Sequence, residues 1–138
     1  MGRLISRGCA AILAICGSVP FAQAEISLVS AWKHCEPTKG CMKFAFMPNG
    51  HVVEQYPIGG NIVTAYGNFR IDGDVLKIGW RRFDPAEVCA TDDHADAGRR
   101  CVSTGQDDIE GHFRFEGLNT LFWTTPRSPP LRLVRIQL

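Results

Sequence analysis

The chain has 138 residues, and its 15 lysines and arginines nearly balance its 14 aspartates and glutamates. This balance gives no bulk electrostatic attraction to nucleic acid or to an anionic membrane, so we expect no nucleic-acid partner. The length suits one domain with a single hydrophobic core.

The first 24 residues have the features of a secretory signal peptide. Arg3 and Arg7 precede an uncharged apolar stretch over residues 9–19, and Ala22-Gln23-Ala24 is a small-x-small cleavage site. The apolar stretch is shorter than the roughly 20 residues that cross a bilayer, and we expect no transmembrane segment in the mature chain. We therefore predict an exported, periplasmic or secreted domain over residues 25–138.

Six cysteines are divided between this leader and the mature chain. Cys16 lies where a bacterial lipid-attachment site would end, but Ile15 is bulkier than the residue such sites prefer, so a lipid anchor is a minor alternative. The mature chain keeps four cysteines, and an even number in an exported protein indicates disulfides. No two of them have the spacing of structural zinc ligands, and we expect no cofactor. Because each pair would bracket a short polar segment, we favour two of the possible pairings: Cys35 with Cys41, and Cys89 with Cys101.

The mature chain carries strand signals throughout, with short alternating segments between Gly, Pro and Asn turns and no sustained helical period. Asn49-Gly50 and Asp72-Gly73-Asp74 are typical of hairpin turns. We therefore predict an all-β fold, an antiparallel meander of about eight strands that closes into a small barrel and so removes its exposed edges. The predicted strands are residues 27–35, 41–47, 51–56, 62–71, 75–83, 109–117, 120–125 and 131–138.

Residues 84–106 interrupt this pattern. We expect one long irregular loop there, tethered by the second disulfide, with room for a single turn of helix at residues 85–88. Long tethered loops often carry function, so this loop is a candidate contact surface. Its candidate binding residues are Asp92, Asp93, His94, Asp96, Arg99 and Arg100.

A Gly-x-Phe-Arg motif occurs twice, at residues 67–70 and 111–114, and each copy continues into a turn and a returning strand. The period of two predicts that each phenylalanine faces the interior and each arginine faces solvent. Gly73 and Gly117 supply the turn conformations that a β-carbon would resist. The repeat therefore indicates a structural module rather than a chemical site.

With these hairpins, and with "FMPNGHV" as an early one, the chain resembles the lipocalin-like (calycin-type) small β-barrels of exported bacterial proteins. Lipocalins proper also have Gly-x-Trp on the first strand, where this chain has Ser30-Ala31-Trp32. In lipocalins a late arginine packs across that tryptophan, and the candidates for it in this chain are Arg127, Arg132 and Arg135. The mature chain is short for a barrel with a roomy cavity, so the sequence leaves open whether the interior is packed or hollow.

We expect a non-enzymatic binding module, either an inhibitor or immunity-type protein or a carrier of a small apolar ligand. It would act through the barrel mouth and the 84–106 loop. Tryptophans are candidates for a pocket lining, although on amphipathic strands they more often belong to the core. These candidates are Trp32, Trp80 and Trp123.

Two other functions remain open. A periplasmic metal-binding protein would use His94 with Asp92 and Asp96, or His34 with His51. A small hydrolase would use a pair of carboxylates that the sequence does not identify. We find no Gly-x-Ser-x-Gly context for a nucleophile.

Overall fold

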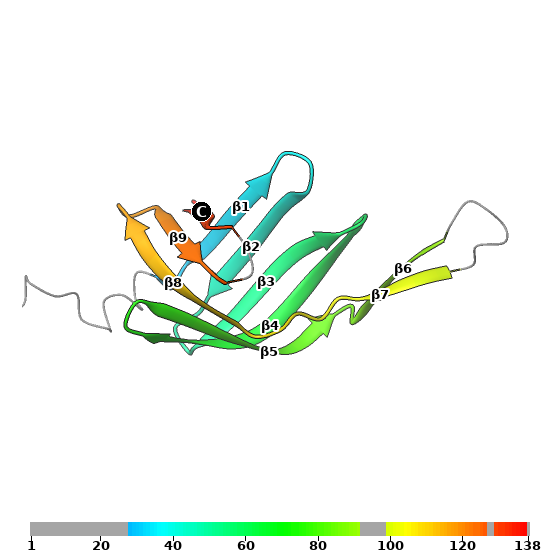
Figure 1. The fold of residues 1–138 in the computed structure, drawn as a ribbon, viewed down its shortest axis with the longest axis horizontal. Helices are drawn as coiled ribbons and strands as arrows, with labels where there is room; N and C mark the ends of the chain where they lie inside the picture. Colours follow the sequence, from blue (N-terminus) through cyan, green and yellow to red (C-terminus); the bar gives the residue numbers. More distant parts are fainter. Residues whose placement is uncertain (1–27, 92–98, 127–128, 138) are drawn as a thin grey trace, which may run out of the picture.

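The computed structural model describes residues 28–91, 99–126 and 129–137. Eight strands form a closed antiparallel barrel, in the order β1-β10-β9-β8-β5-β4-β3-β2, which confirms the predicted all-β meander (Figure 1). Within the described ranges, no helix is long and apolar enough to cross a membrane. The barrel strands are β1 (Ala31–Glu36), β2 (Gly40–Phe46), β3 (His51–Ile58), β4 (Asn61–Asp72), β5 (Val75–Asp84), β8 (Ile109–Glu116), β9 (Thr120–Thr124) and β10 (Leu131–Arg135).

The structure corrects the irregular loop and the helical turn predicted within residues 84–106. β6 (Glu87–Thr91) and β7 (Arg99–Ser103) pair with each other as a separate two-stranded sheet. β6 and β7 together are called the arm, which follows β5 and precedes β8 in the chain and extends away from the barrel (Figure 1). Val88 is the one buried residue among the described side chains of this ribbon. A two-stranded ribbon with so little to bury does not need the apolar alternation by which strands are recognised.

Both predicted disulfides are present. Cys35 pairs in register with Cys41 across the β1–β2 hairpin, and the two are bonded. Cys89 likewise lies opposite Cys101 in the arm, and they form the second disulfide. Each bond therefore joins directly facing residues of one hairpin.

One end of the barrel is closed around Trp32, which is fully buried. Its indole Nε1 donates a hydrogen bond to the Leu28 carbonyl at 2.9 Å, and the guanidinium carbon of Arg135 lies 4.4 Å from the ring centroid. Of the three arginines considered for this position, Arg135 is therefore the one that packs over the tryptophan. Arg132 is exposed on β10, and Arg127 lies outside the described residues.

The two Gly-x-Phe-Arg copies have the predicted orientation, with each phenylalanine buried and each arginine exposed. Their turn glycines have positive φ angles, 65° and 68°. The first glycine of each copy has a further role, because a Cβ on Gly67 would lie 2.9 Å from the Trp80 ring and one on Gly111 would lie 2.8 Å from Trp123 Nε1. Each repeat therefore uses a glycine to make room for the tryptophan of its returning strand.

Candidate functional site

A pocket of about 830 Å³, here called the mouth pocket, occupies the end of the barrel opposite Trp32. Side chains of β1, β2, β3, β9 and β10 line it, together with residues 106–110, which follow the arm. The barrel is thus packed at its closed end and hollow at its mouth.

Two aromatic rings form the floor of the mouth pocket. Phe44 is 2% exposed and Trp123 is 1% exposed, and they meet edge to face with ring centroids 5.9 Å apart. Met42, Ile109 and Leu131 are half-buried on the walls. The pocket therefore presents a mainly apolar surface to whatever enters it.

Glu54 is the one buried carboxyl group among the described residues, with 3% of the residue exposed. It alternates with Val52 on β3 and therefore points into the barrel, where it lines the mouth pocket. Burial raises the pKa of Glu54 to about 7, and the hydrogen bond from Gln106 opposes this rise. In that bond Gln106 Nε2 donates to Glu54 Oε1 at 2.8 Å.

A second set of hydrogen bonds anchors the arm to the barrel mouth. Tyr56 Oη donates to the carbonyl of Thr104 at 2.5 Å, and Thr104 Oγ1 donates to the carbonyl of Pro85 at 2.5 Å. The backbone amide of Thr104 also donates to the carbonyl of Ala86 at 3.1 Å. Burial raises the pKa of Tyr56 as well, since the phenol lies partly inside the mouth. Thr104 thus connects both sides of the arm to β3.

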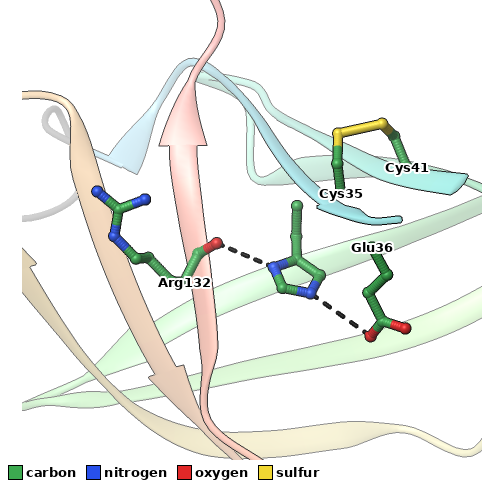
Figure 2. The surroundings of a disulfide bond; sticks show 5 residues. Cys35, Glu36, Cys41 and Arg132 are labelled. Carbon is green, nitrogen blue, oxygen red and sulfur yellow. Dashed lines mark hydrogen bonds and ion pairs between the residues drawn. A yellow bond between two sulfur atoms is a disulfide. The ribbon is translucent and has the colours of Figure 1, made fainter. Parts of the chain in front are cut away.

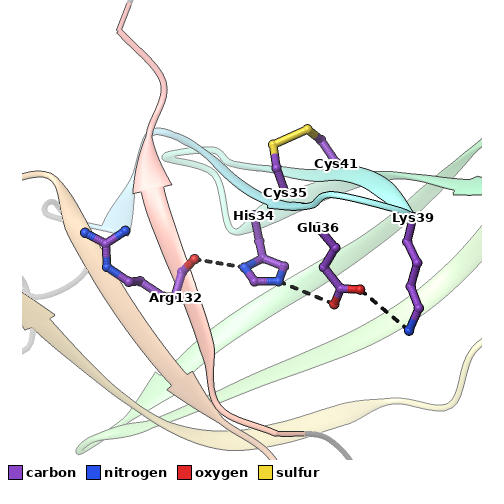
Figure 3. Close-up of polar contacts among 6 residues, drawn as sticks. All are labelled: His34, Cys35, Glu36, Lys39, Cys41 and Arg132. Carbon is purple, nitrogen blue, oxygen red and sulfur yellow. Dashed lines mark hydrogen bonds and ion pairs between the residues drawn. A yellow bond between two sulfur atoms is a disulfide. The ribbon is translucent and has the colours of Figure 1, made fainter.

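The rim of the mouth carries a chain of polar contacts that starts at His34 (Figure 3). His34 Nδ1 lies 3.0 Å from the carbonyl oxygen of Arg132, and because a carbonyl only accepts, Nδ1 carries the proton. His34 Nε2 lies 3.6 Å from Glu36, whose other oxygen lies 3.5 Å from Lys39 Nζ. Figure 2 shows the first disulfide on the opposite side of β1 from Glu36, so the bond lies outside the mouth pocket.

The three candidate tryptophans lie in different places. Trp123 lines the mouth pocket, whereas Trp32 closes the other end of the barrel. Trp80 is half-buried on β5 and packs against Phe83, with ring centroids 6.1 Å apart. Among the described residues, two buried side-chain nitrogen or oxygen atoms lack a hydrogen-bond partner, and they are the indole nitrogens of Trp80 and Trp123.

Of the candidate residues of the 84–106 segment, Arg100 has a described side chain, and it does not line the mouth pocket. Arg99 begins β7, and Arg100 is exposed on the same strand. The remaining four lie outside the described residues: Asp92, Asp93, His94 and Asp96.

The metal-site alternative built on His34 and His51 is not supported by their positions. His34 lies at the mouth, near the β1–β2 turn, whereas His51 begins β3 at the opposite end of the barrel. Within the described ranges, one group of three potential ligands is close enough to hold a metal, namely Glu87 with Cys89 and Cys101, and both of its cysteines are in a disulfide.

Sequence analysis missed Glu54 and Gln106. A signal for Glu54 was available, because it occupies an inward position in the alternation of "HVVEQY", between Val52 and Tyr56. An acid in phase with a core face is unusual and is often functional. Gln106 had no such signal, since its contact depends on where the chain returns after the arm.

No family model matches the chain, and no curated protein matches it significantly. The class of this protein is therefore described from its fold and its site. This protein is a small closed β-barrel with a hollow mouth and a buried carboxyl group in that mouth.

Proposed function

We propose that this protein is an exported binding module that takes a small, largely apolar ligand into the mouth pocket. The observation that carries the proposal is the pocket itself, whose volume of about 830 Å³ falls in the usual range for small-molecule sites. An apolar floor with a few convergent polar groups is the usual composition of such sites. The leader-like N-terminus and the two disulfides support export.

The experiment uses a neutral fluorescent probe, N-phenyl-1-naphthylamine, titrated into the mature domain. Leu131→Trp would fill the pocket from its wall, and we expect it to weaken probe binding at least tenfold. Leu118→Trp is the matched control, because Leu118 is 83% exposed in the β8–β9 turn and does not line the pocket. Binding that survives Leu131→Trp, or no binding by the unmodified domain, would contradict the proposal.

A second candidate function, capture of a protein partner by the arm, is favoured by the shape of the arm. β6 and β7 pair only with each other among the described residues, so each has an outer edge that could accept another strand. Val102 is 54% exposed on β7. Partners captured from a periplasmic extract by the whole domain, but not by a variant with residues 87–103 replaced by a short linker, would support an inhibitor or immunity-type role. Equal capture by both forms would exclude the arm as the contact.

A further inference from the structure

The described side chains that line the mouth pocket include more acidic than basic groups. Among the described lining residues, five carry a carboxyl group and two are basic, Lys39 and His34. One of the five, Glu110, pairs with Lys77 at 3.2 Å. The lysine and the histidine both contact Glu36 at the rim, where Lys39 Nζ and His34 Nε2 lie 3.5 Å and 3.6 Å from its oxygens. Both basic groups that the structure describes in the pocket therefore already contact Glu36 at its edge.

Glu54 lies deeper and has no cationic partner within the part of the chain that the structure describes. Its carboxyl group receives the hydrogen bond from Gln106, and no Lys, Arg or His side chain in the described part of the chain forms an ion pair with it. The other charged or titratable side chains that line its surroundings are His34 and Glu36 from β1, Lys39 from the following turn, Tyr56 from its own strand, and Asp107, Asp108 and Glu110 beyond the arm. A buried carboxyl without a cation is costly once ionised, and a cation bound beside it removes that cost.

The rest of the pocket also suits a cation with an apolar body. Phe44 and Trp123 present aromatic surfaces, which attract organic cations as well as apolar groups. An anionic head group would instead meet the surplus of carboxylates, three of them exposed at the rim. The carboxyl groups and the aromatic surface of the pocket therefore both favour a cation with an apolar body.

We propose that the ligand of the mouth pocket is an amphipathic amine, whose ammonium group pairs with Glu54 while its apolar body covers Phe44 and Trp123. This inference rests on the proposed binding function. The ammonium pairs with the ionised carboxylate, so binding removes the Glu54 proton wherever the empty site still holds it. Because burial raises the pKa of Glu54 to about 7, part of the empty protein still holds this proton at neutral pH, and binding releases it.

The test compares three probes with the same chain: nonylamine, nonan-1-ol and sodium nonanoate. Calorimetric titrations at pH 7 in phosphate and in Tris buffer measure both affinity and proton release, since the two buffers differ in ionisation enthalpy. We expect nonylamine to bind most tightly and nonanoate most weakly, and only nonylamine to release a proton.

Glu54→Gln keeps the size of the side chain and removes its charge. We expect this variant to weaken nonylamine binding tenfold or more, to abolish the proton release and to leave nonan-1-ol binding within about threefold. Glu116→Gln, at an exposed acid of β8 that does not line the pocket, is the matched control and should change nonylamine binding by less than threefold. Retained binding of N-phenyl-1-naphthylamine shows that each variant keeps its pocket.

The outcomes separate the two proposals. If amine and alcohol bind equally and Glu54→Gln affects neither, the mouth pocket is a ligand site but the cationic head group is wrong. Tightest binding of nonanoate would also overturn the inference. If neither the naphthylamine probe nor any nonyl compound binds, the proposed function itself fails.

Discussion

Gln106 donates a hydrogen bond to Glu54 across the barrel mouth, although 52 positions separate the two residues in the chain. The bond satisfies one carboxyl oxygen but does not neutralise the charge. Burial outweighs it, so the pKa of Glu54 stays raised at about 7. The mouth therefore holds a group whose charge changes near neutral pH.

Glu54→Gln should stabilise the empty protein at high pH. Between about pH 4.5 and about pH 7 the unfolded chain has lost the Glu54 proton while the folded protein keeps it, so the free energy of unfolding falls as the pH rises. Above about pH 7 both states are ionised, and Glu54 causes no further change in stability. The stability advantage of Glu54→Gln over the unmodified protein should therefore grow by about 2 kcal/mol between pH 5 and pH 8. Urea unfolding at both pH values measures it, and Glu116→Gln, an exposed acid on β8, should show no such growth. An advantage that is the same at both pH values would contradict the raised pKa.

Gly111→Ala should destabilise the barrel by about 2 kcal/mol. The new methyl group would press on the Trp123 indole and on the backbone of Thr124, neither of which can move cheaply. Gly60→Ala is the matched control, because a Cβ at Gly60 meets nothing within 4 Å, and it should change stability by less than about 0.5 kcal/mol. Thermal unfolding followed by circular dichroism compares the two, and equal midpoints would show that the close approach is unimportant.

Arg135→Lys should lower the free energy of unfolding by about 1 kcal/mol even though the charge is kept. Lysine lacks the planar group that lies over Trp32, and it also lacks the Nε–H that donates to the Leu118 carbonyl at 3.0 Å. Arg132→Lys, exposed on the same strand, should have little effect. Denaturant unfolding measures the free energy of unfolding of both variants. If both equal the unmodified protein, Arg135 does not contribute to closing the barrel.

Tyr56→Phe should loosen the arm without unfolding the barrel. It removes the hydroxyl that donates to Thr104, a bond worth about 1 kcal/mol, from the place where the arm joins the mouth. Hydrogen exchange should then become about fivefold faster for amides of β6 and β7, with little change in β2 and β3. Tyr66→Phe serves as control, since the Tyr66 ring lies on the barrel under the guanidinium of Arg82. If hydrogen exchange in the arm is unchanged in Tyr56→Phe, the hydrogen bond from Tyr56 to Thr104 does not stabilise the arm.

The two disulfides should contribute differently to global stability. Replacing Cys35 and Cys41 by alanine removes a crosslink within the barrel and should cost about 2 kcal/mol. Replacing Cys89 and Cys101 by alanine should disorder the arm, because a two-stranded sheet is marginally stable by itself. The barrel should lose less than about 1 kcal/mol, because an arm that is disordered in both the folded and the unfolded protein loses no entropy on folding. Urea unfolding of the two double variants measures the difference, and equal losses would mean that arm and barrel unfold as one unit.

Much of the fold follows from local pattern in the sequence. Alternation predicted all eight barrel strands, and the turn glycines Gly73 and Gly117 have the positive φ that hairpins need. Both disulfides were predicted from the short segments they bracket. These features involve residues close together in the chain, where the period of two and the geometry of tight turns determine the outcome.

The candidate site required the tertiary structure. Three features depend on how distant strands close into one barrel. They are the surroundings of Glu54, the choice of the arginine that packs over Trp32, and the position of Gln106 after the arm. The two strands of the arm were not predicted from the sequence, because a two-stranded ribbon that buries little surface needs no regular apolar alternation. Sequence alone determined the barrel strands and their pairing within hairpins. The closure of the barrel decided that one inward carboxyl group, Glu54, would be buried in the mouth, because burial and its effect on charge arise only from contacts between distant segments.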